Sequence, residues 1–354
     1  MIGGAKDDAC FVKRGWNRAM RELWIADRHK GQLGNKLMFF AAAYAWCLEE
    51  GAKLYWPTLH RYADLFPAMA GQRLISPNDP SPVDESPARR AARQQRTAFW
   101  LRLAAKLRVL PGVVRKPSGY VAVALPPTWQ EFPSPALRVR GRLYMTAWRF
   151  FNPVGIRRHR DAILAATRPQ PEIERDADRF ASALAPDRLW IGVHVRGGDY
   201  AGFVGGKHFH PVERYVAEMH AVAERFRARR PGFVIFSDQP RNAAEFPGLD
   251  VLLSAGSAIE DLTRMSRLKL VIGPLSTFSA WAMYRSGGVA FHFGPPAKED
   301  GLEWVYSGYP VARSLEEAAR GFERVEGGAR FEPEIDVASE ALRPAKQCRV
   351  QSAK

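Results

Sequence analysis

The second half of the chain alternates between short apolar runs and stretches with helical spacing. Runs rich in β-branched residues occur at 189–195, 233–236, 251–253, 270–272 and 289–293. Between them lie helical stretches at 212–229, 259–267 and 278–285, with a shorter piece near 241–246. Strands that are apolar throughout are typical of a parallel sheet covered by helices on both faces. The pattern therefore predicts a doubly wound α/β domain.

The first half begins with a similar but shorter pattern. A strand is expected at 23–26, followed by the turn GQLGN, a long apolar helix at 36–50 and a strand at 53–56. A chain of 354 residues is long enough for two domains. With the segment 167–172 as linker and a Pro- and Ser-rich loop at 76–88, we predict the following division. The N-terminal domain covers 1–169, the C-terminal domain 170–330 and a tail 331–354.

The net charge of +15 is concentrated in one place. Residues 89–116 carry nine basic side chains and no acidic one, and within this insertion 96–110 has the pattern of a basic amphipathic helix. Its apolar residues are Phe99, Leu103, Leu107 and Leu110, and Arg102 and Lys106 lie on another face. Such a helix can cover its own core, lie on an anionic membrane or bind a polyanion. No recognised nucleic-acid module accompanies the charge, so no nucleic-acid partner is expected.

Hydropathy and cysteine content limit the other classes of protein. No run of apolar residues approaches the length needed to span a bilayer, and the first residues contain no apolar signal segment. We therefore expect a cytoplasmic protein. If the basic helix binds a membrane, the protein would be peripheral on the inner face of that membrane. Cys10, Cys47 and Cys348 are far apart and form no C-x-x-C pair, which argues against a disulfide framework or a zinc site. Cys47 is interpreted as a core residue.

Polar residues follow each predicted strand of the second half. Because ligands of open parallel sheets bind beyond the carboxyl ends of the strands, these residues form the candidate site. They are His194 and Arg196, then Ser237 and Asp238, then 254–257, then 273–277, and finally 293–294. Ser276 and Thr277 open a helix whose first amides can bind phosphate, and Arg196 can add a bidentate guanidinium. The simpler alternatives are an N-cap for Ser276 and an ion pair with Asp199 for Arg196.

Two weaker motifs are set aside. Asp176 and Asp178 have D-x-D spacing but lie in a charged helical stretch, where a solvated face is the simpler interpretation. Gly206 and Lys207 resemble the end of a P-loop, but the required glycine upstream and the hydroxyl residue after the lysine are missing. Eight histidines without ligand spacing predict no metal site and no cofactor.

Several motifs together resemble the α-1,2-fucosyltransferases of glycosyltransferase family 11. GQLGNKLMFFAAAYA at 31–45 is similar to the opening motif of that family, and HVRGGDY at 194–200 to its H-V-R-R-G-D-Y. YMTAWRFF, HPVERYVAEM, FSDQPRNAAEF and DLTRMSRLKLVIGPLSTFSAWAMY resemble further family segments. The order and spacing hold from about residue 23 to 294. The sequence departs from the family motifs at four positions. It has Gly197 in place of a second arginine, Gln239 in place of a second aspartate, Lys36 in place of a glutamine and Ala280 in place of a tryptophan. These departures bear on acceptor choice and on activity.

The resemblance implies a GT-B fold with two Rossmann-like domains. It implies an inverting, metal-independent transfer of L-fucose from GDP-fucose to a glycan hydroxyl, most often α-1,2 to galactose. An enzyme of other linkage, such as α-1,6, and a catalytically silent glycan-binding relative stay open as alternatives.

The resemblance also assigns roles to individual residues. Arg196 is expected to hold the β-phosphate of GDP, and Asp199 either acts as general base or orients Arg196. Asp261 is a candidate for guanine recognition, with a helix N-terminal charge as the alternative. The remaining donor-side candidates are His194, Asp238, Ser276, Thr277 and Phe278, and the acceptor-side candidates are Gly34, Asn35, Trp148 and Tyr200, with Asn35 also counted as catalytic.

Overall fold

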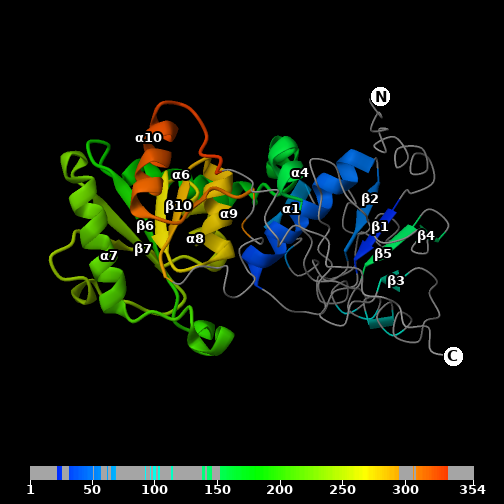
Figure 1. Cartoon of the computed structure of the whole chain (residues 1–354), viewed down its shortest axis with the longest axis horizontal. Helices are drawn as coiled ribbons and strands as arrows, with labels where there is room; N and C mark the ends of the chain where they lie inside the picture. Colours follow the sequence, from blue (N-terminus) through cyan, green and yellow to red (C-terminus); the bar gives the residue numbers. More distant parts are fainter. Residues whose placement is uncertain are drawn as a thin grey trace, which may run out of the picture.

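The computed structural model describes most of the second half of the chain and part of the first. The described residues are 22–25, 32–50, 52–56, 113–114, 138–139, 142–145, 152–294, 306 and 308–333, with a few residues between 62 and 103. They form two lobes, each built on its own sheet (Figure 1). Trp148 and most of the basic segment 89–116 lie outside these residues.

The C-terminal lobe is built on a parallel six-stranded sheet. The strands are β6 (Trp190–Val195), β7 (Gly232–Ser237), β8 (Val251–Leu253), β9 (Leu270–Gly273), β10 (Val289–His292) and β11 (Val311–Ala312). Their order across the sheet is β11-β10-β9-β6-β7-β8, and all five neighbouring pairs are parallel. The five predicted strands are confirmed. β11 is an addition, because two residues are too few to give a sequence signal.

Helices cover both faces of this sheet (Figure 1). They are α6 (Pro171–Ala183), α7 (Val212–Arg225), α8 (Ala258–Met265), α9 (Thr277–Ser286) and α10 (Leu315–Glu326). Alternate strand residues enter two separate cores: Val193 packs with α7 and α10, whereas Val234 packs with α8 and α9. The doubly wound α/β prediction is therefore confirmed.

Three helix predictions differ in detail from the structure. The helix expected at 36–50 begins three residues earlier, at Leu33, so that the last part of the predicted GQLGN turn is helical. The stretch 212–229 is not one helix, because α7 ends at Arg225 and a short 3-10 turn, Arg227–Arg229, leads to Arg230 at φ 49°. The stretch 241–246 contains only the 3-10 turn Ala243–Glu245, which Asn242 caps.

The N-terminal lobe holds shorter strands. They are β1 (Glu22–Ile25), β2 (Lys53–Tyr55), β3 (Val113–Val114), β4 (Arg138–Val139) and β5 (Arg142–Met145), with the parallel order β2-β1-β5-β3 and β4 antiparallel to β5. β1 and β2 follow the prediction, whereas β3 to β5 were missed in a region without regular hydrophobic spacing. Helices α4 (Pro153–Arg158) and α5 (Arg160–Ala166) lead from this lobe into the C-terminal one.

Helix α1 (Leu33–Glu50) belongs to both lobes. All its residues from Leu37 to Cys47 are buried, including Cys47, as expected for a helix that is apolar on every side. Its core cluster contains Leu23 from β1 but also Trp281 from α9. The Tyr309 hydroxyl donates a hydrogen bond to the carbonyl of Met38 at 3.1 Å. One continuous core therefore joins the two sheets.

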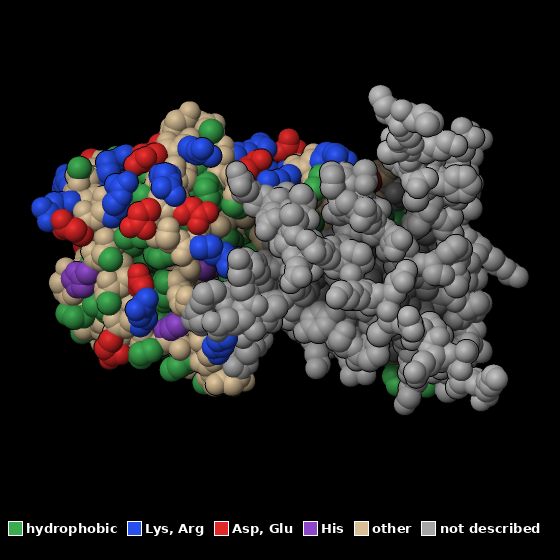
Figure 2. Space-filling model, viewed as in Figure 1, with side chains coloured by type: hydrophobic (Ala, Val, Ile, Leu, Met, Phe, Trp, Pro, Cys, Tyr) green, Lys and Arg blue, Asp and Glu red, His purple; other side chains and the backbone are tan. Residues whose placement is uncertain are grey.

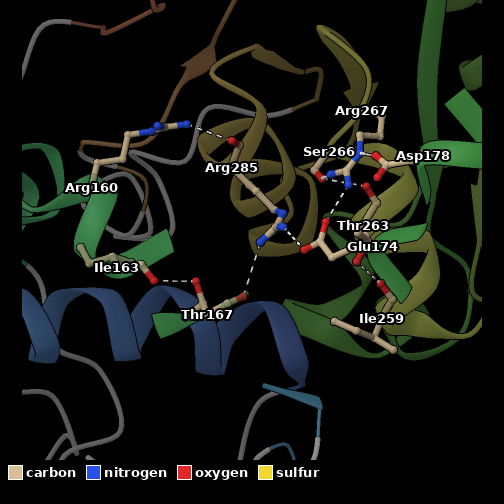
Figure 3. Close-up of polar contacts among 10 residues, drawn as sticks. All are labelled: Arg160, Ile163, Thr167, Glu174, Asp178, Ile259, Thr263, Ser266, Arg267 and Arg285. Atoms are coloured by element: carbon tan, nitrogen blue, oxygen red, sulfur yellow. Dashed lines mark hydrogen bonds and ion pairs between the residues drawn. The ribbon is translucent and has the colours of Figure 1, made fainter. Parts of the chain in front are cut away.

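A group of arginines and carboxylates ties the helices of one face together, and we call it the arginine clamp (Figure 3). Its members are Arg160, Glu174, Asp178, Arg267 and Arg285. Glu174 on α6 accepts hydrogen bonds from Arg267 at 2.6 Å and from Arg285 on α9. Arg160 donates to the carbonyl oxygens of residues 284 and 285, at 2.8 and 2.9 Å, and so caps the carboxyl end of α9.

The D-x-D pair belongs to the same set of helix contacts. Asp178 accepts from Arg267 at 2.8 Å, and Asp176 accepts from Arg264 at 2.8 Å. Both carboxylates are thus bound to arginines that follow or belong to α8.

Basic and acidic side chains also alternate over the visible face of the C-terminal lobe (Figure 2). Within the described part of the chain, no helix is long and apolar enough to cross a bilayer.

Candidate functional site

The site lies where the direction of the sheet reverses. From β6 the chain moves outward to β7 and β8, and then returns to β9 on the other side of β6 before continuing to β10. The carboxyl ends of β6 and β9 therefore border the switch point at which α/β sheets bind ligands. Arg196 follows β6, and Ser276 with Thr277 follows β9. The structure brings these predicted residues to adjacent strand ends.

Arg196 is held by two carboxylates and an aromatic ring. Its guanidinium donates to Asp199, lies 3.3 Å from an oxygen of Asp238 and stands 4.8 Å from the centroid of the Tyr200 ring. The side chain is only 12% exposed, and its Nε has no hydrogen-bond partner among the described residues. Its backbone N–H donates to the Tyr215 hydroxyl at 3.0 Å. A guanidinium held in a fixed position is suited to binding an oxyanion.

Tyr200 connects the arginine to the start of α9. Its hydroxyl donates to the carbonyl of Leu275 at 2.7 Å and also hydrogen-bonds with Ser276. Burial raises the pKa of Tyr200 to about 12, so the phenol stays neutral at physiological pH. The resemblance assigns Tyr200 to the acceptor side, whereas these contacts favour a supporting role beneath Arg196.

The start of α9 is capped from within. The Ser276 hydroxyl accepts a hydrogen bond from the Phe278 amide at 3.2 Å, which confirms the N-cap interpretation of this serine. Thr277, the first helical residue, is half-buried at the same end. No acidic residue occupies the first turn of α9, and none occupies the first turn of α1.

The start of α1 lies directly against the start of α9. A Cβ added at Gly34 would lie 2.8 Å from the Phe278 nitrogen, so only glycine permits this approach. Asn35 follows it in the first turn of α1, and Gln32, just before the helix, donates to Asp199 at 3.2 Å. Two helix N-termini with positive dipole ends thus meet near Arg196, with no acidic residue in either first turn; the carboxylates nearby, Asp199 and Asp238, are paired with Arg196. The arrangement favours a bound anion.

Two buried histidines lie at the same edge of the sheet. The His194 ring stacks on Phe278 with ring centroids 5.1 Å apart, and burial, assisted by Arg196, holds the pKa of His194 well below its usual value. His292, at the end of β10, lies 2.9 Å from the Ser279 hydroxyl, and burial lowers its pKa to about 3. Both rings are therefore neutral. In the described part of the chain, the Nδ1 atoms of His194 and His292 have no partner.

Other predicted residues are placed less centrally. Asp238 joins the site through Arg196 and through the Gly197 amide, at 2.9 Å. Asp261 lies on α8, beyond the edge strand β8, where it accepts from Ser254 at 2.6 Å. Burial raises the pKa of Asp261 to about 6. The structure does not bring Asp261 into contact with Arg196, and Trp148 lies outside the described residues.

Sequence reasoning missed three contributors to the site: Gln32, Tyr215 and His292. His292 was hidden because the predicted strand ran to residue 293, which placed it inside the strand rather than at its end. Gln32 and Tyr215 act through contacts between distant segments, and no local pattern indicates those.

The family comparison decides the class of this segment. Residues 179–301 match the model of glycosyl transferase family 11, so the resemblance seen in the motifs is confirmed there. This part of the chain carries the glycosyl transferase family 11 pattern. It includes Arg196, Asp199, Asp238, Asp261 and the start of α9. No sequence among curated proteins matches the chain.

Several solved structures are similar at low identity. POFUT1 in complex with GDP has 13% identity and a TM-score of 0.43, over 77% of this chain and 96% of that one. The fucosyltransferase NodZ from Bradyrhizobium has 18% identity and a TM-score of 0.39, over 74% and 92%. A mutant of FUT1 from Arabidopsis thaliana in complex with GDP has 11% identity and a TM-score of 0.47, over 80% and 72%.

Proposed function

We propose that the protein is a fucosyltransferase that moves L-fucose from GDP-fucose to a glycan hydroxyl. The observation that carries the proposal is the position of Arg196 beside the joined N-termini of α1 and α9. Such a place suits a diphosphate, and the family 11 pattern of the same segment makes the ligand a nucleotide sugar. Fucose, and transfer α-1,2 to galactose, follow from the motif resemblance; an α-1,6 enzyme is the competing linkage.

In the proposed reaction the bond between fucose C1 and the β-phosphate oxygen breaks while a bond from the acceptor oxygen to C1 forms. Inversion at C1 follows because the acceptor attacks from the face opposite the leaving group. GDP leaves with the electron pair of the broken bond, and the acceptor proton passes to a base. Arg196 and the two helix starts stabilise the charge that develops on the diphosphate, which allows transfer without a metal.

Contacts in the structure bear on the role of Asp199, and we also propose a role for Asp261. Asp199 accepts from Arg196 through one oxygen and from Gln32 through the other, at 3.2 Å. With both oxygens engaged, Asp199 is better suited to orient Arg196 than to take the acceptor proton. We assign the guanine N1–H and N2–H groups to Asp261, with the His194 backbone as a second contact. Gly34 and Asn35 would face the sugar.

Calorimetric titration tests this proposal. GDP and GDP-fucose are titrated in the presence of EDTA into the wild type, into Arg196→Ala and into the control Arg225→Ala. The control removes an arginine on α7 that is paired with Glu323 at 3.1 Å, away from the switch point. Binding by the wild type and the control, but not by Arg196→Ala, supports the donor site. Glycan binding without any affinity for GDP would instead favour the silent relative.

We further propose that residues 96–110 contact an anionic membrane surface, which would place the protein peripherally on the inner face of the membrane. Phe99 and Trp100 are helical and 53% and 62% exposed, and Arg96 is exposed as well. Exposed aromatic rings among basic residues suit the interface of an anionic bilayer. Flotation with phosphatidylserine-containing vesicles tests this. The double variant Arg102→Glu, Lys106→Glu should lose flotation, and unchanged flotation would contradict the proposal.

A further inference from the structure

Gly197 lies under the loop that follows β7. A Cβ added at Gly197 would lie 2.3 Å from Gln239 Oε1 and 3.3 Å from an Nη of Arg241, and the glycine is buried. Gly197 and Gln239 are two of the four departures from the fucosyltransferase motifs. The structure shows that they are neighbours in space: the side chains of the β7 loop occupy the volume that a side chain at position 197 would fill.

The Arg241 guanidinium is fixed in this volume. Its Nε donates to the Ser237 hydroxyl at 3.3 Å, and Nη1 donates to Glu245 at 3.1 Å. The Asn242 amide donates to Glu245 at 2.6 Å, and this bond, with Arg241, lowers the pKa of Glu245 and keeps it ionised. The arginine side chain is only 16% exposed. Nη2, the nitrogen nearest to Gly197, makes no hydrogen bond among the described residues.

The same loop also reaches Arg196. Asp238, the neighbour of Gln239, accepts from the Gly197 amide at 2.9 Å and lies 3.3 Å from the Arg196 guanidinium. Arg196 is therefore offset by two carboxylates, Asp199 and Asp238. A diphosphate carries at least two negative charges, so a second cation at this edge would add to its binding.

We infer that Arg241 provides the second guanidinium of the donor site, in place of the arginine that the motif resemblance expects at position 197. Gly197 leaves the volume open, Gln239 fills the part of it nearest the backbone, and Arg241 enters from β7 with its free Nη2. Its ligand is the diphosphate of the nucleotide sugar. The inference rests on the proposed function and names a further binding residue of the same site.

GDP titration of Arg241→Ala tests the inference. A charge-assisted hydrogen bond to phosphate contributes enough that its loss should weaken GDP binding about 10- to 100-fold. Glu245→Gln removes the ion pair but keeps the guanidinium, so its affinity for GDP should stay within a few-fold of the wild type. Arg227→Ala, which removes an exposed arginine paired with Glu224, is the matched control.

Moving the charge back gives a stricter test. The triple variant Gly197→Arg, Gln239→Asp, Arg241→Ala places the cation as in the family motifs and should recover most of the affinity lost in Arg241→Ala. Thermal melts identify variants that do not fold. Wild-type affinity in a folded Arg241→Ala, or an equal loss in Glu245→Gln, would overturn the inference. If Arg196→Ala alone abolishes binding, the proposed function stands and only this inference fails; if the wild type binds no GDP, both fail.

Discussion

The arginine clamp and the candidate site both pair arginines with carboxylates, but with different consequences. In the arginine clamp, Glu174 is 18% exposed and lies between arginines of neighbouring helices. At the candidate site, Asp199 is 52% exposed and belongs to a short 3-10 turn after β6. A carboxylate shielded from solvent holds its arginine permanently in an ion pair. An exposed carboxylate can be displaced from its arginine by a ligand anion. The contrast holds between Arg285, which pairs with Glu174, and Arg196, which pairs with Asp199; in the other pairs Asp178 of the clamp is 64% exposed and Asp238 at the site is 22% exposed. The exposed partner Asp199 is therefore what distinguishes Arg196 from Arg285.

Glu174→Gln should have the largest effect on stability. It removes the negative charge that two largely buried arginines share, and breaking a buried pair costs about 3–5 kcal/mol of unfolding free energy. Urea denaturation measures the loss. Glu316→Gln, an acidic residue in the first turn of α10 and outside the clamp, is the control. The fraction that folds should bind GDP normally. A destabilisation below about 1 kcal/mol would mean that the clamp resembles an ordinary surface pair.

Arg196→Ala should show the opposite pattern. Turnover of GDP-fucose should fall about 100- to 1,000-fold, the range for losing one stabiliser of the developing charge. The unfolding free energy should change by about 1 kcal/mol or less, because Asp199 reaches solvent and Asp238, although only 22% exposed, keeps its hydrogen bond from the Gly197 amide. Steady-state kinetics and urea denaturation on the same preparation give both values. A large loss of stability would place Arg196 in the same class as the clamp arginines.

Gly34→Ala probes the contact between the two helix starts. The added methyl would lie 2.8 Å from the Phe278 nitrogen, and relieving such a clash costs about 1–3 kcal/mol. The shift should also weaken GDP binding, since both helix ends move. Gly202→Ala is the control, because nothing lies within 4 Å of a Cβ there and φ is −105°. Equal behaviour of the two variants would show that the approach of α1 to α9 tolerates a side chain.

Lowering the pH should reduce the free energy of unfolding, because His292 is buried in its neutral form. Its pKa is about 3 in the folded protein and about 6.5 in the unfolded chain, so the unfolded chain takes up the proton first as pH falls. The contribution of neutral His292 to the free energy of unfolding is therefore complete above pH 6.5 and is lost progressively below it. Between pH 6.5 and 5.5 the wild type should lose about 1 kcal/mol more than His292→Asn, measured by urea denaturation. Parallel pH profiles would contradict this.

Much of the C-terminal lobe could be predicted because its signals are local. Five strands can be recognised as apolar runs rich in β-branched residues. Because the carboxyl ends of parallel strands lie at one edge of the sheet, Arg196 and Ser276 were expected close together. Other features depend on contacts between distant segments. The approach of Gly34 to Phe278, the bond from Gln32 to Asp199 and the position of Arg241 leave no periodic trace. The short strands β3 to β5 contain too few residues to show alternation.

The shared core of α1 has a consequence for synthesis of the chain. The helix ends at Glu50, and its partner α9 begins at Thr277, so about 230 residues are translated before the partner exists. At about 5–20 residues per second, this interval lasts roughly 10 to 45 seconds. During it, the ribosome carries an apolar helix that lacks the part of its core contributed by α9, Trp281 included. Correct folding therefore depends on keeping that helix from associating with other nascent chains until the second sheet is complete.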